Sequence, residues 1–459
     1  MKFTKMLVLI TDILNKDADT QVDVCLTAQM ANQIELWTRM YENRSPWVNN
    51  KDVFSANLAP AIASELARLV TLEMKSDITG GSAANYLDEQ YKKKVIKDIR
   101  RYVEYGCAKG GLIIKPYVTK QGLAVQYVQA DCFFPLSFDS SGRITQCVFT
   151  EQFRKGKKIY TRLEVHTLQG DHIQINNRAF VATNDYSLGS EVPVGSVDRW
   201  SELAPNVTFE GADRLLFGYF KIPMANAEDS DSPLGVSVYS RAVDLIQEAD
   251  RRYSNICWEY EGTQLAVHVA TSMLKYNKDQ DRFEYPGGKA RLYRNLDYDT
   301  GVTDKPFFDT FSPEIRDVAL FNGFNNQLKL IEFNCCLAYG TLSDPQNIDK
   351  TATEIKTSKQ RSYTMVSDTQ MALQDALEDL VYAMNFWAVL YGLVPPGSDY
   401  KVSFDWDDSV IVDAETEREQ DRKDVAMGVM RVEEYRAKWY GETLEEAAKN
   451  LPDVAAVEE

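Results

Sequence analysis

The sequence predicts an α+β protein with a separate helical hairpin, because two apolar periodicities alternate along its 459 residues. Up to about residue 105, apolar side chains recur at helical spacing, whereas from Gly110 they alternate with polar ones as they do in strands. Two further apolar helical stripes, at 236–261 and 313–340, enclose a segment of short strands and turns. We therefore expect an antiparallel sheet packed on helices, together with a two-helix hairpin that carries a small β module.

The N-terminal region is expected to be helical, with segments at 22–41, 53–75 and 88–105. The apolar stretch Met6–Ile10 marks the start of an earlier helix, since it is too short for a signal sequence. Gly80–Ser82 interrupts the region as a loop. No strand is expected before this loop and no Lys-Ser/Thr pair follows it, so it is not a phosphate-binding loop.

Strand patterns dominate from Gly110 onward. Turn signals such as Asp139–Gly142 and Lys155–Gly156 separate the strands. Residues 182–235 are expected to be rich in loops, with one strand around 215–221. The five main strands are expected at 112–117, 123–128, 144–149, 158–167 and 173–181.

The helical hairpin is the most informative feature of the sequence. Its second helix is expected to begin at Ser312–Glu314, with serine as N-cap and proline at the first helical position, and to end at Gly340. Strands at 265–269 and 290–296 lie between the two helices. A protruding hairpin cannot bury both of its apolar stripes alone, so it needs a neighbour.

The C-terminal part contains a long helix, one strand and an acidic helical tail. Thr351 and Glu354 have the spacing of a capping box, and their helix runs to about Gly392, with 364–368 as a candidate break. The charge-free run 380–397 is broken by prolines and is too short for a membrane span, so we expect a buried helix. The remaining elements are a strand at 401–406 and tail helices at 414–427 and 431–450, with breaks at Gly428 and Gly441.

Composition constrains the partners and the compartment. The formal net charge of −17 is opposite in sign to the charge that holds nucleic acid tightly. DNA is therefore either not a partner of this protein or passes it without being bound tightly. The seven cysteines are scattered and include no CxxC pair, which is typical of reduced thiols in a cytoplasmic setting.

Signals for an enzyme are weak. No GxSxG, HExxH or P-loop motif occurs. His166 lies within a strand pattern and is expected to be structural, and the acidic turn Asp405–Asp408 is more typical of a strand end than of a metal site. We expect no catalytic residues, no cofactor and no bound metal. A soluble enzyme with a helical cap is the least favoured alternative.

Five stretches of the chain match a known family in register. They are Tyr105–Gly111 before a strand, Gln129–Pro135 followed by Phe138, Asp139 and Gly142, Glu164–His166, Ser232–Tyr239 and Lys350–Ile355. Over roughly residues 50–450, the chain resembles the portal proteins of tailed bacteriophages, in the group found in phages and prophages of Gram-positive bacteria.

The resemblance implies a portal-type fold that assembles as a homo-oligomeric ring, usually of twelve subunits. The wing would comprise 1–231, with N-terminal helices and antiparallel sheet, and 363–411, with a helix and a strand. The remaining parts would be stem helix 1 at 232–262, the clip at 263–311, stem helix 2 at 312–340, the tunnel loop and its helix at 341–362, and the acidic helical crown at 412–459.

Such a ring is the structural channel at the head–tail vertex through which double-stranded DNA is packaged and ejected. The resemblance implies docking of the terminase large subunit and later of a head-completion adaptor protein. The virion and its precursor would also hold major capsid and scaffolding proteins, with assembly in the host cytoplasm and no membrane partner. The main alternative is another virion head or connector component that lacks a DNA channel.

Three groups of residues are candidates for these contacts. A basic cluster near the start of the long helix would either contact DNA phosphates in the tunnel or form a solvent-exposed face of the helix. Strand edges in the clip are suited to pairing with a partner by strand addition. The candidates are Lys350, Lys356, Lys359 and Arg361 for the DNA tunnel; Tyr239, Val243, Ile246, Tyr253, Ile315, Phe324, Leu328 and Ile331 for the subunit interface of the stem; and Lys289, Arg291, Tyr293 and Arg294 for docking by the clip.

Overall fold

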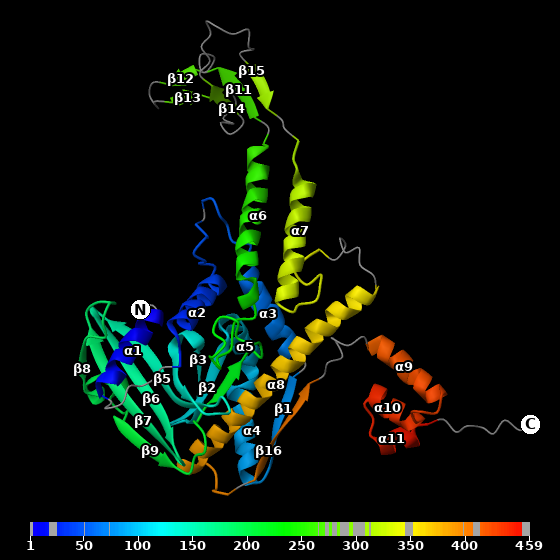
Figure 1. The fold of residues 1–459 in the computed structure, drawn as a ribbon. Helices are drawn as coiled ribbons and strands as arrows, with labels where there is room; N and C mark the ends of the chain where they lie inside the picture. The colour runs from blue at the N-terminus through cyan, green and yellow to red at the C-terminus, as the bar shows by residue number, and fades with distance from the viewer. Residues whose placement is uncertain are drawn as a thin grey trace, which may run out of the picture.

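The chain folds into a body of helices and sheets, a long helical hairpin that projects from the body, and a small helical unit after the last strand (Figure 1). None of the helices in the described part of the chain has the length and hydropathy that a bilayer crossing requires. The computed structural model describes residues 3–17, 25–49, 51–72, 74–264, 266–270, 275–277, 282–284, 293–296, 308–311, 314–344, 352–397, 399–406 and 414–451.

Five helices open the body, and their buried faces share one core with the long helix α8. Their apolar positions recur at three- and four-residue intervals, as in α3, where Leu58, Ile62 and Leu66 are buried. The five helices are α1 (Phe3–Asp17), α2 (Ala28–Tyr41), α3 (Leu58–Thr71), α4 (Ser82–Lys94) and α5 (Ile99–Lys109).

All three predicted helices in this region have the wrong bounds. The helix expected at 22–41 begins only at Ala28, after the N-cap Thr27. The helix expected at 53–75 is shorter, because Met74–Gly80 forms strand β1, which pairs with β16 (Tyr400–Trp406) far along the chain. The helix expected at 88–105 is two helices, separated by a 3-10 turn at Ile96–Asp98. Local periodicity cannot reveal a partner strand that is so remote in sequence, nor a break that tertiary packing sets.

Two antiparallel sheets form the rest of the body. The smaller has the strand order β10-β2-β3, and the larger has the order β4-β5-β6-β7-β8, with β9 paired to the other part of β7. The five predicted strands are confirmed as β2, β3, β5, β6 and β7, and the strand expected around 215–221 is β10. Their bounds are β2 (Gly111–Thr119), β3 (Gly122–Gln129), β4 (Phe133–Phe138), β5 (Ile144–Lys155), β6 (Lys158–Gln169), β7 (His172–Ala182), β8 (Ser190–Val192), β9 (Asn206–Glu210) and β10 (Gly218–Lys221).

Strand β4 was not expected, because it contains Pro135 in a stretch that reads as a loop. The strand lies at the edge of its sheet and pairs only with β5 among the described strands. Proline lacks the N–H group that a central strand must donate, but an edge strand tolerates it. The short strands β8 and β9 were also missed, and both add to β7 from the loop-rich region.

The long helix α8 (Ala352–Leu390) crosses the body without interruption, so the candidate break at 364–368 is wrong (Figure 1). It packs on β10 and β2 at close range. A Cβ atom at Gly218 of β10 would collide with the carbonyl oxygen of Ala376. Glycine at this position therefore allows the backbones of helix and strand to meet.

The hairpin consists of α6 (Val243–Gly262) and α7 (Asp317–Asn334), which lie side by side and carry a β module at their tip (Figure 1). Helix α6 begins later than predicted, because the residues before it are buried in the body. Tyr239 is fully buried there, and its hydroxyl donates a hydrogen bond to the carbonyl oxygen of Trp37 at 2.9 Å. Helix α7 is also shorter than predicted, and the cap expected at Ser312–Pro313 lies outside the described residues.

The module at the tip contains short strands, as expected for the segment between the helices. One sheet has the order β14-β11-β15, in which β11 and β14 are parallel, and β12 pairs with β13. The predicted strands at 265–269 and 290–296 correspond to β11 and β14. The bounds are β11 (Ala266–Ala270), β12 (Lys275–Asn277), β13 (Arg282–Glu284), β14 (Tyr293–Leu296) and β15 (Phe308–Phe311).

The tail forms three helices: α9 (Ala414–Ala426), α10 (Val432–Tyr440) and α11 (Leu444–Lys449). The expected segment 431–450 is thus split. Gly441 ends α10 in the left-handed conformation, with a φ of 67°. Thr443 then caps α11 by accepting a hydrogen bond from the backbone N–H of Glu446.

We expect Gly218→Ala to destabilise the protein, because the added methyl group meets backbone atoms of α8 that cannot swing aside. Overpacking of this kind costs about 1–3 kcal/mol, which urea unfolding would measure as a lower midpoint. Gly195→Ala is the matched control, since a Cβ atom there has no neighbour within 4 Å. Equal stability of Gly218→Ala and wild type would contradict the close contact between α8 and β10.

Candidate functional site

The outer face of α7 is exposed and largely apolar, and the half-buried Lys329 is its one charged residue. Val318, Leu330 and Phe333 are 70%, 52% and 52% exposed, whereas Leu328 and Ile331 are buried against the rest of the chain. Charged residues are depleted at the centre of protein–protein interfaces, and exposed apolar patches mark interaction sites. The exposed residues of α7 are Val318, Ala319, Phe321, Asn322, Asn326, Leu330 and Phe333.

The outer face of α6 has a different character, because charged residues and one tryptophan share it. The residues at heptad-like spacing on this face are Asp244, Arg251, Asn255 and Trp258. Tyr253 lies instead beside Phe324 of α7, with 6.3 Å between ring centroids. Tyr260 lies in the same way beside Phe321, at 6.5 Å. The hairpin therefore presents two dissimilar outer surfaces.

The structure places four of the eight predicted stem-interface residues inside the chain, and the assignment is corrected for these four. Tyr253 and Ile315 are exposed, and Val243 and Phe324 are half-buried. The apolar stripe that the sequence reveals packs within the chain, whereas the outer apolar residues alternate with Asn and Ala and form no clear pattern. The buried candidates, which offer no surface to a second copy, are Tyr239, Ile246, Leu328 and Ile331.

Two buried carboxylates of α6 hold the hairpin in place. Asp250 accepts hydrogen bonds from Trp47 Nε1 and from the backbone N–H of Ala56, both at 2.8 Å, and so fixes the loop between α2 and α3. Burial raises the pKa of Asp250. Glu259, nearer the tip, accepts hydrogen bonds from the backbone and guanidinium of Arg316 at 3.2, 3.1 and 2.7 Å. The hydrogen bonds from Arg316 lower the pKa of Glu259, and the pair ties the ends of α6 and α7 together.

A third buried carboxylate organises the loop that follows α7. Glu332 Oε1 accepts hydrogen bonds from the backbone N–H groups of Gly340, Leu342 and Ser343 at 3.2, 2.6 and 2.8 Å. Its Oε2 accepts a further one from Ser343 Oγ at 2.8 Å. The exit path of the chain from α7 is therefore fixed to the last turn of the helix.

Two of the four DNA-tunnel candidates have described side chains. Lys359 is exposed near the N-terminal end of α8. Arg361 instead stacks its guanidinium on the rings of Phe333 and Tyr339, at 4.5 and 5.4 Å from their centroids. The other two candidates are Lys350, which lies outside the described residues, and Lys356, which is described only as part of helix α8.

Two of the four candidates for docking by the clip lie within the described residues. Lys289 and Arg291 lie outside the described residues. Tyr293 and Arg294 begin strand β14, which pairs with β11 and has no second neighbour among the described strands. This places them on an open sheet edge at the tip of the hairpin.

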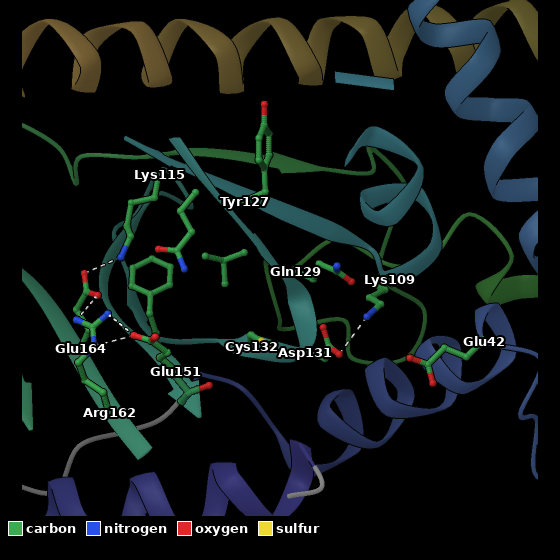
Figure 2. A pocket seen from close by; sticks show the side chains of 14 residues that line it. Glu42, Lys109, Lys115, Tyr127, Gln129, Asp131, Cys132, Glu151, Arg162 and Glu164 are labelled. Carbon is green, nitrogen blue, oxygen red and sulfur yellow. Dashed lines mark hydrogen bonds and ion pairs between the residues drawn. The ribbon is translucent and has the colours of Figure 1, made fainter. Parts of the chain in front are cut away.

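A polar cavity of about 380 Å³ lies in the body where β2 and β3 face β5 and β6 (Figure 2). Lys115 Nζ lies 2.7 Å from Glu164 Oε1, and Arg162 Nη1 lies 2.9 Å from Glu164 Oε2. Glu151 is held in turn by Arg162 and Arg199, at 3.1 and 2.7 Å. A larger cavity of about 940 Å³ shares Lys115, Glu151, Arg162 and Glu164 with the first.

His166 completes this charge network, with its Nε2 atom 2.6 Å from Glu164 Oε1. Burial alone would raise the pKa of Glu164, but Lys115, His166 and Arg162 hold it well below its ordinary value. Burial lowers the pKa of His166, and the contact with Glu164 only partly opposes this effect. His166 is therefore neutral and donates its Nε2 proton to an ionised carboxylate.

The network suits a structural role better than a chemical one. Cations contact both oxygens of Glu164 and hold its pKa low, so this carboxylate is not poised to exchange a proton near neutral pH. Within the residues that the structure describes, no three His, Cys, Asp or Glu side chains lie close enough together to hold a metal ion. The buried Glu164 and the half-buried Glu151 instead join β2, β5 and β6 across the cavity.

We expect the protein to lose stability as the pH falls below about 6.5. The pKa of His166 is lowered by folding, so the unfolded chain takes up a proton that the folded chain refuses, and linkage then favours unfolding. His166→Gln should make the free energy of unfolding less dependent on pH between 7.5 and 5.5, measured by urea denaturation. His172→Gln, at the start of β7, controls for loss of an imidazole. An unchanged slope in His166→Gln would contradict the buried, neutral imidazole.

Comparison with known proteins gives weak matches to solved structures and an extensive match to one family. No curated protein is similar enough to this chain to count as a match. Among solved structures, 62 chains match it. One of them, described as the neck of a native GTA particle computed with C12 symmetry, is 10% identical, with a TM-score of 0.43 over 83% of this chain and 89% of that chain.

The extensive match is to a protein family. The model of the family described as phage portal protein, SPP1 Gp6-like, matches residues 28–449, which run from α2 to α11. Proteins of this family are structural components of the phage virion and not a family of enzymes. Because the match takes in the body, the hairpin and the tail helices, the chain belongs to the SPP1 Gp6-like family of phage portal proteins.

Proposed function

We propose that copies of this chain form a closed ring at the head–tail vertex of a tailed phage, and that double-stranded DNA enters and leaves the capsid through its central channel. The observation that carries the proposal is the exposed, largely apolar face of α7 on a hairpin that projects from the body. A lone chain leaves this face in water, whereas a ring buries it. Membership of the portal family supports the same arrangement.

A closed ring requires two different faces on each subunit, because its copies meet head to tail. The two outer surfaces of the hairpin supply such faces. Trp258 on α6 is 67% exposed, and tryptophan is among the residues that dominate binding energy at interface centres. We infer that α7 of one subunit packs on α6 of the next, in a ring of about twelve, the number usual for the family.

The parts of the molecule have distinct roles in this proposal. The body is the wing, α6 and α7 are the stem, and the strands at the tip are the clip. Residues 341–362 are the tunnel loop and its helix, and α9 to α11 are the crown. The open edge of β14 in the clip offers backbone hydrogen bonds to a partner strand.

The proposed partners follow from these roles. The clip docks the terminase large subunit during packaging and a head-completion adaptor afterwards. The ring assembles with major capsid and scaffolding proteins in the host cytoplasm and remains in the virion.

The acidic composition suits a channel through which DNA slides. DNA carries one charge per about 1.7 Å of its axis, and a uniformly basic wall would hold it by releasing counterions. A net charge of −17 per chain repels DNA from the wall and keeps it moving. Lys356 and Lys359, at the start of α8, are the candidates for the few attractive contacts.

Combining Val318→Glu with Leu330→Glu should convert rings into single chains, because it places two charges in an apolar interface. Native mass spectrometry and negative-stain images of the purified protein measure this outcome. The variant should keep its circular dichroism, while wild type forms a ring with a central hole. Val8→Glu is a control that adds one such charge at an exposed apolar position of α1.

Two outcomes would overturn the ring channel. A stable, monomeric wild-type protein would remove the need for a neighbour. A closed assembly without a central hole would favour a connector component that conducts no DNA.

Combining Lys356→Glu with Lys359→Glu should lower the amount of DNA packaged per particle, because it removes the attractive contacts of the channel wall. Rings should still form, and packaged DNA is measured after nuclease treatment of the particles. Lys157→Glu combined with Lys158→Glu, at the exposed turn between β5 and β6, is the control of equal charge. Normal packaging by the α8 variant would assign these lysines to a solvated helix face.

A further inference from the structure

Positive charge gathers where α4 meets α5. Six of the chain's 51 lysine and arginine residues lie within residues 92–101, together with one acidic residue, Asp98. All six basic side chains are exposed, although the chain as a whole carries a net charge of −17. The fold therefore concentrates positive charge at one place on an acidic molecule. The six residues are Lys92, Lys93, Lys94, Lys97, Arg100 and Arg101.

Four of these six bases have no carboxylate partner. Lys92 is paired with Asp77 and Asp88, at 2.6 and 2.8 Å. Arg100 donates a hydrogen bond from Nε to Thr71 Oγ1 at 3.0 Å. None of the other four forms a salt bridge with a residue that the structure describes. We call these four residues the basic stripe: Lys93, Lys94, Lys97 and Arg101.

The basic stripe faces away from the core. Val95 and Ile99, four residues apart, are buried. Lys93, Lys97 and Arg101 have the same four-residue spacing, two positions away, and are exposed. Residues two positions apart point to different sides of a helix, and the short 3-10 turn between α4 and α5 preserves this division.

Two stacked tyrosines connect the two ends of the stripe. The rings of Tyr102 and Tyr127 lie 3.5 Å apart between centroids. The Tyr127 hydroxyl donates a hydrogen bond to the carbonyl oxygen of Lys94 at 3.2 Å. The Arg101 guanidinium lies 4.7 Å from the centroid of the Tyr102 ring and donates a hydrogen bond to its hydroxyl at 2.9 Å. These contacts join the last turn of α4 to the first turn of α5, so the bases of both helices share one surface.

Helix stability accounts for only part of this charge. Lys93 and Lys94 lie in the last turn of α4, where a cation is favoured by the helix dipole. Lys97 precedes α5 and Arg101 lies in its first turn, where the dipole disfavours a cation. Asp98, at the N-cap, makes no capping hydrogen bond through its side chain. The bases at the start of α5 therefore weaken the helix, and a bound anion would offset this effect.

We propose that the basic stripe binds the phosphate backbone of double-stranded DNA. Lysine and arginine side chains neutralise phosphates, and the release of counterions drives such binding. The DNA is that of the function proposed above, and only this identification rests on that function. The stripe belongs to α4 and α5, whereas the channel candidates Lys356 and Lys359 belong to α8. It is therefore a second contact with DNA, one that holds the duplex instead of letting it slide.

An acidic protein surface is the other polyanion that would suit the stripe, and the composition of the stripe favours DNA. The centres of protein–protein interfaces are depleted in lysine and rich in exposed apolar side chains. Three of the four stripe residues are lysines, and Val95 and Ile99 between them are buried. Surfaces that bind DNA are polar and strongly positive, as this one is.

Charge reversal tests the proposal. The purified full-length protein should bind a short fluorescein-labelled DNA duplex at low salt, whatever its base sequence, as fluorescence anisotropy measures. Lys93→Glu combined with Lys97→Glu should weaken this binding by about tenfold or more. The slope of log affinity against log salt should become shallower by about two, because two phosphate contacts are lost.

The controls separate the stripe from net charge and from folding. Lys157→Glu combined with Lys158→Glu makes the same charge change elsewhere and should bind the duplex within about twofold of wild type. Thermal unfolding shows whether each variant folds. Should the reversal variant not fold, Lys93→Gln combined with Lys97→Gln replaces it and should weaken DNA binding by a smaller factor.

Each remaining outcome overturns a distinct claim. No binding of the duplex by wild type, or equal losses in the stripe variant and the control, would overturn the stripe as a DNA-binding surface. Displacement of the duplex by poly-L-glutamate as readily as by unlabelled DNA would identify an acidic protein as the partner instead. A monomeric wild-type protein that binds the duplex through the stripe would overturn the ring and leave this inference in place.

Discussion

A two-helix hairpin can bury only one face of each helix, and this limit governs how the chain associates. The inner faces of α6 and α7 pack on each other and on the body, where Asp250 and Glu259 fix them through hydrogen bonds. The outer face of α7 has no such cover, and Lys329 is its one charged residue. Because the hairpin projects from the body, the free energy of burying that face is available only to a contact between chains.

The body obeys a different constraint, which is that a buried charge must be paired. Glu164 meets this requirement with three nitrogen-bearing side chains from β2 and β6. The network links the two sheets through polar groups whose geometry is set, so the sheets cannot slide freely past each other. Helix α8 extends from the base of the hairpin across the smaller sheet, and Gly218 allows that close crossing. The projecting hairpin is therefore joined to a body whose two sheets and long helix are held against one another.

Much of the fold could be predicted because most elements carry their own periodicity, but several features depend on remote contacts. Strand Met74–Gly80 is defined by a partner near the other end of the chain, and Pro135 is permitted only because its strand is at an edge. Tyr239 continues the spacing of α6 but belongs to the core. The exposed face of α7 was missed because residues such as Asn322 interrupt its apolar pattern. Arg361 could be identified as basic, but its aromatic stacking depends on the loop after α7.

Glu332 has a mechanical consequence. Its carboxylate accepts hydrogen bonds from three backbone N–H groups and one hydroxyl. The segment Gly340–Ser343 is thus bonded to the last turn of α7 rather than joined to it through a hinge. We expect a tilt of α7 to move this segment with it, because helix and loop share these hydrogen bonds.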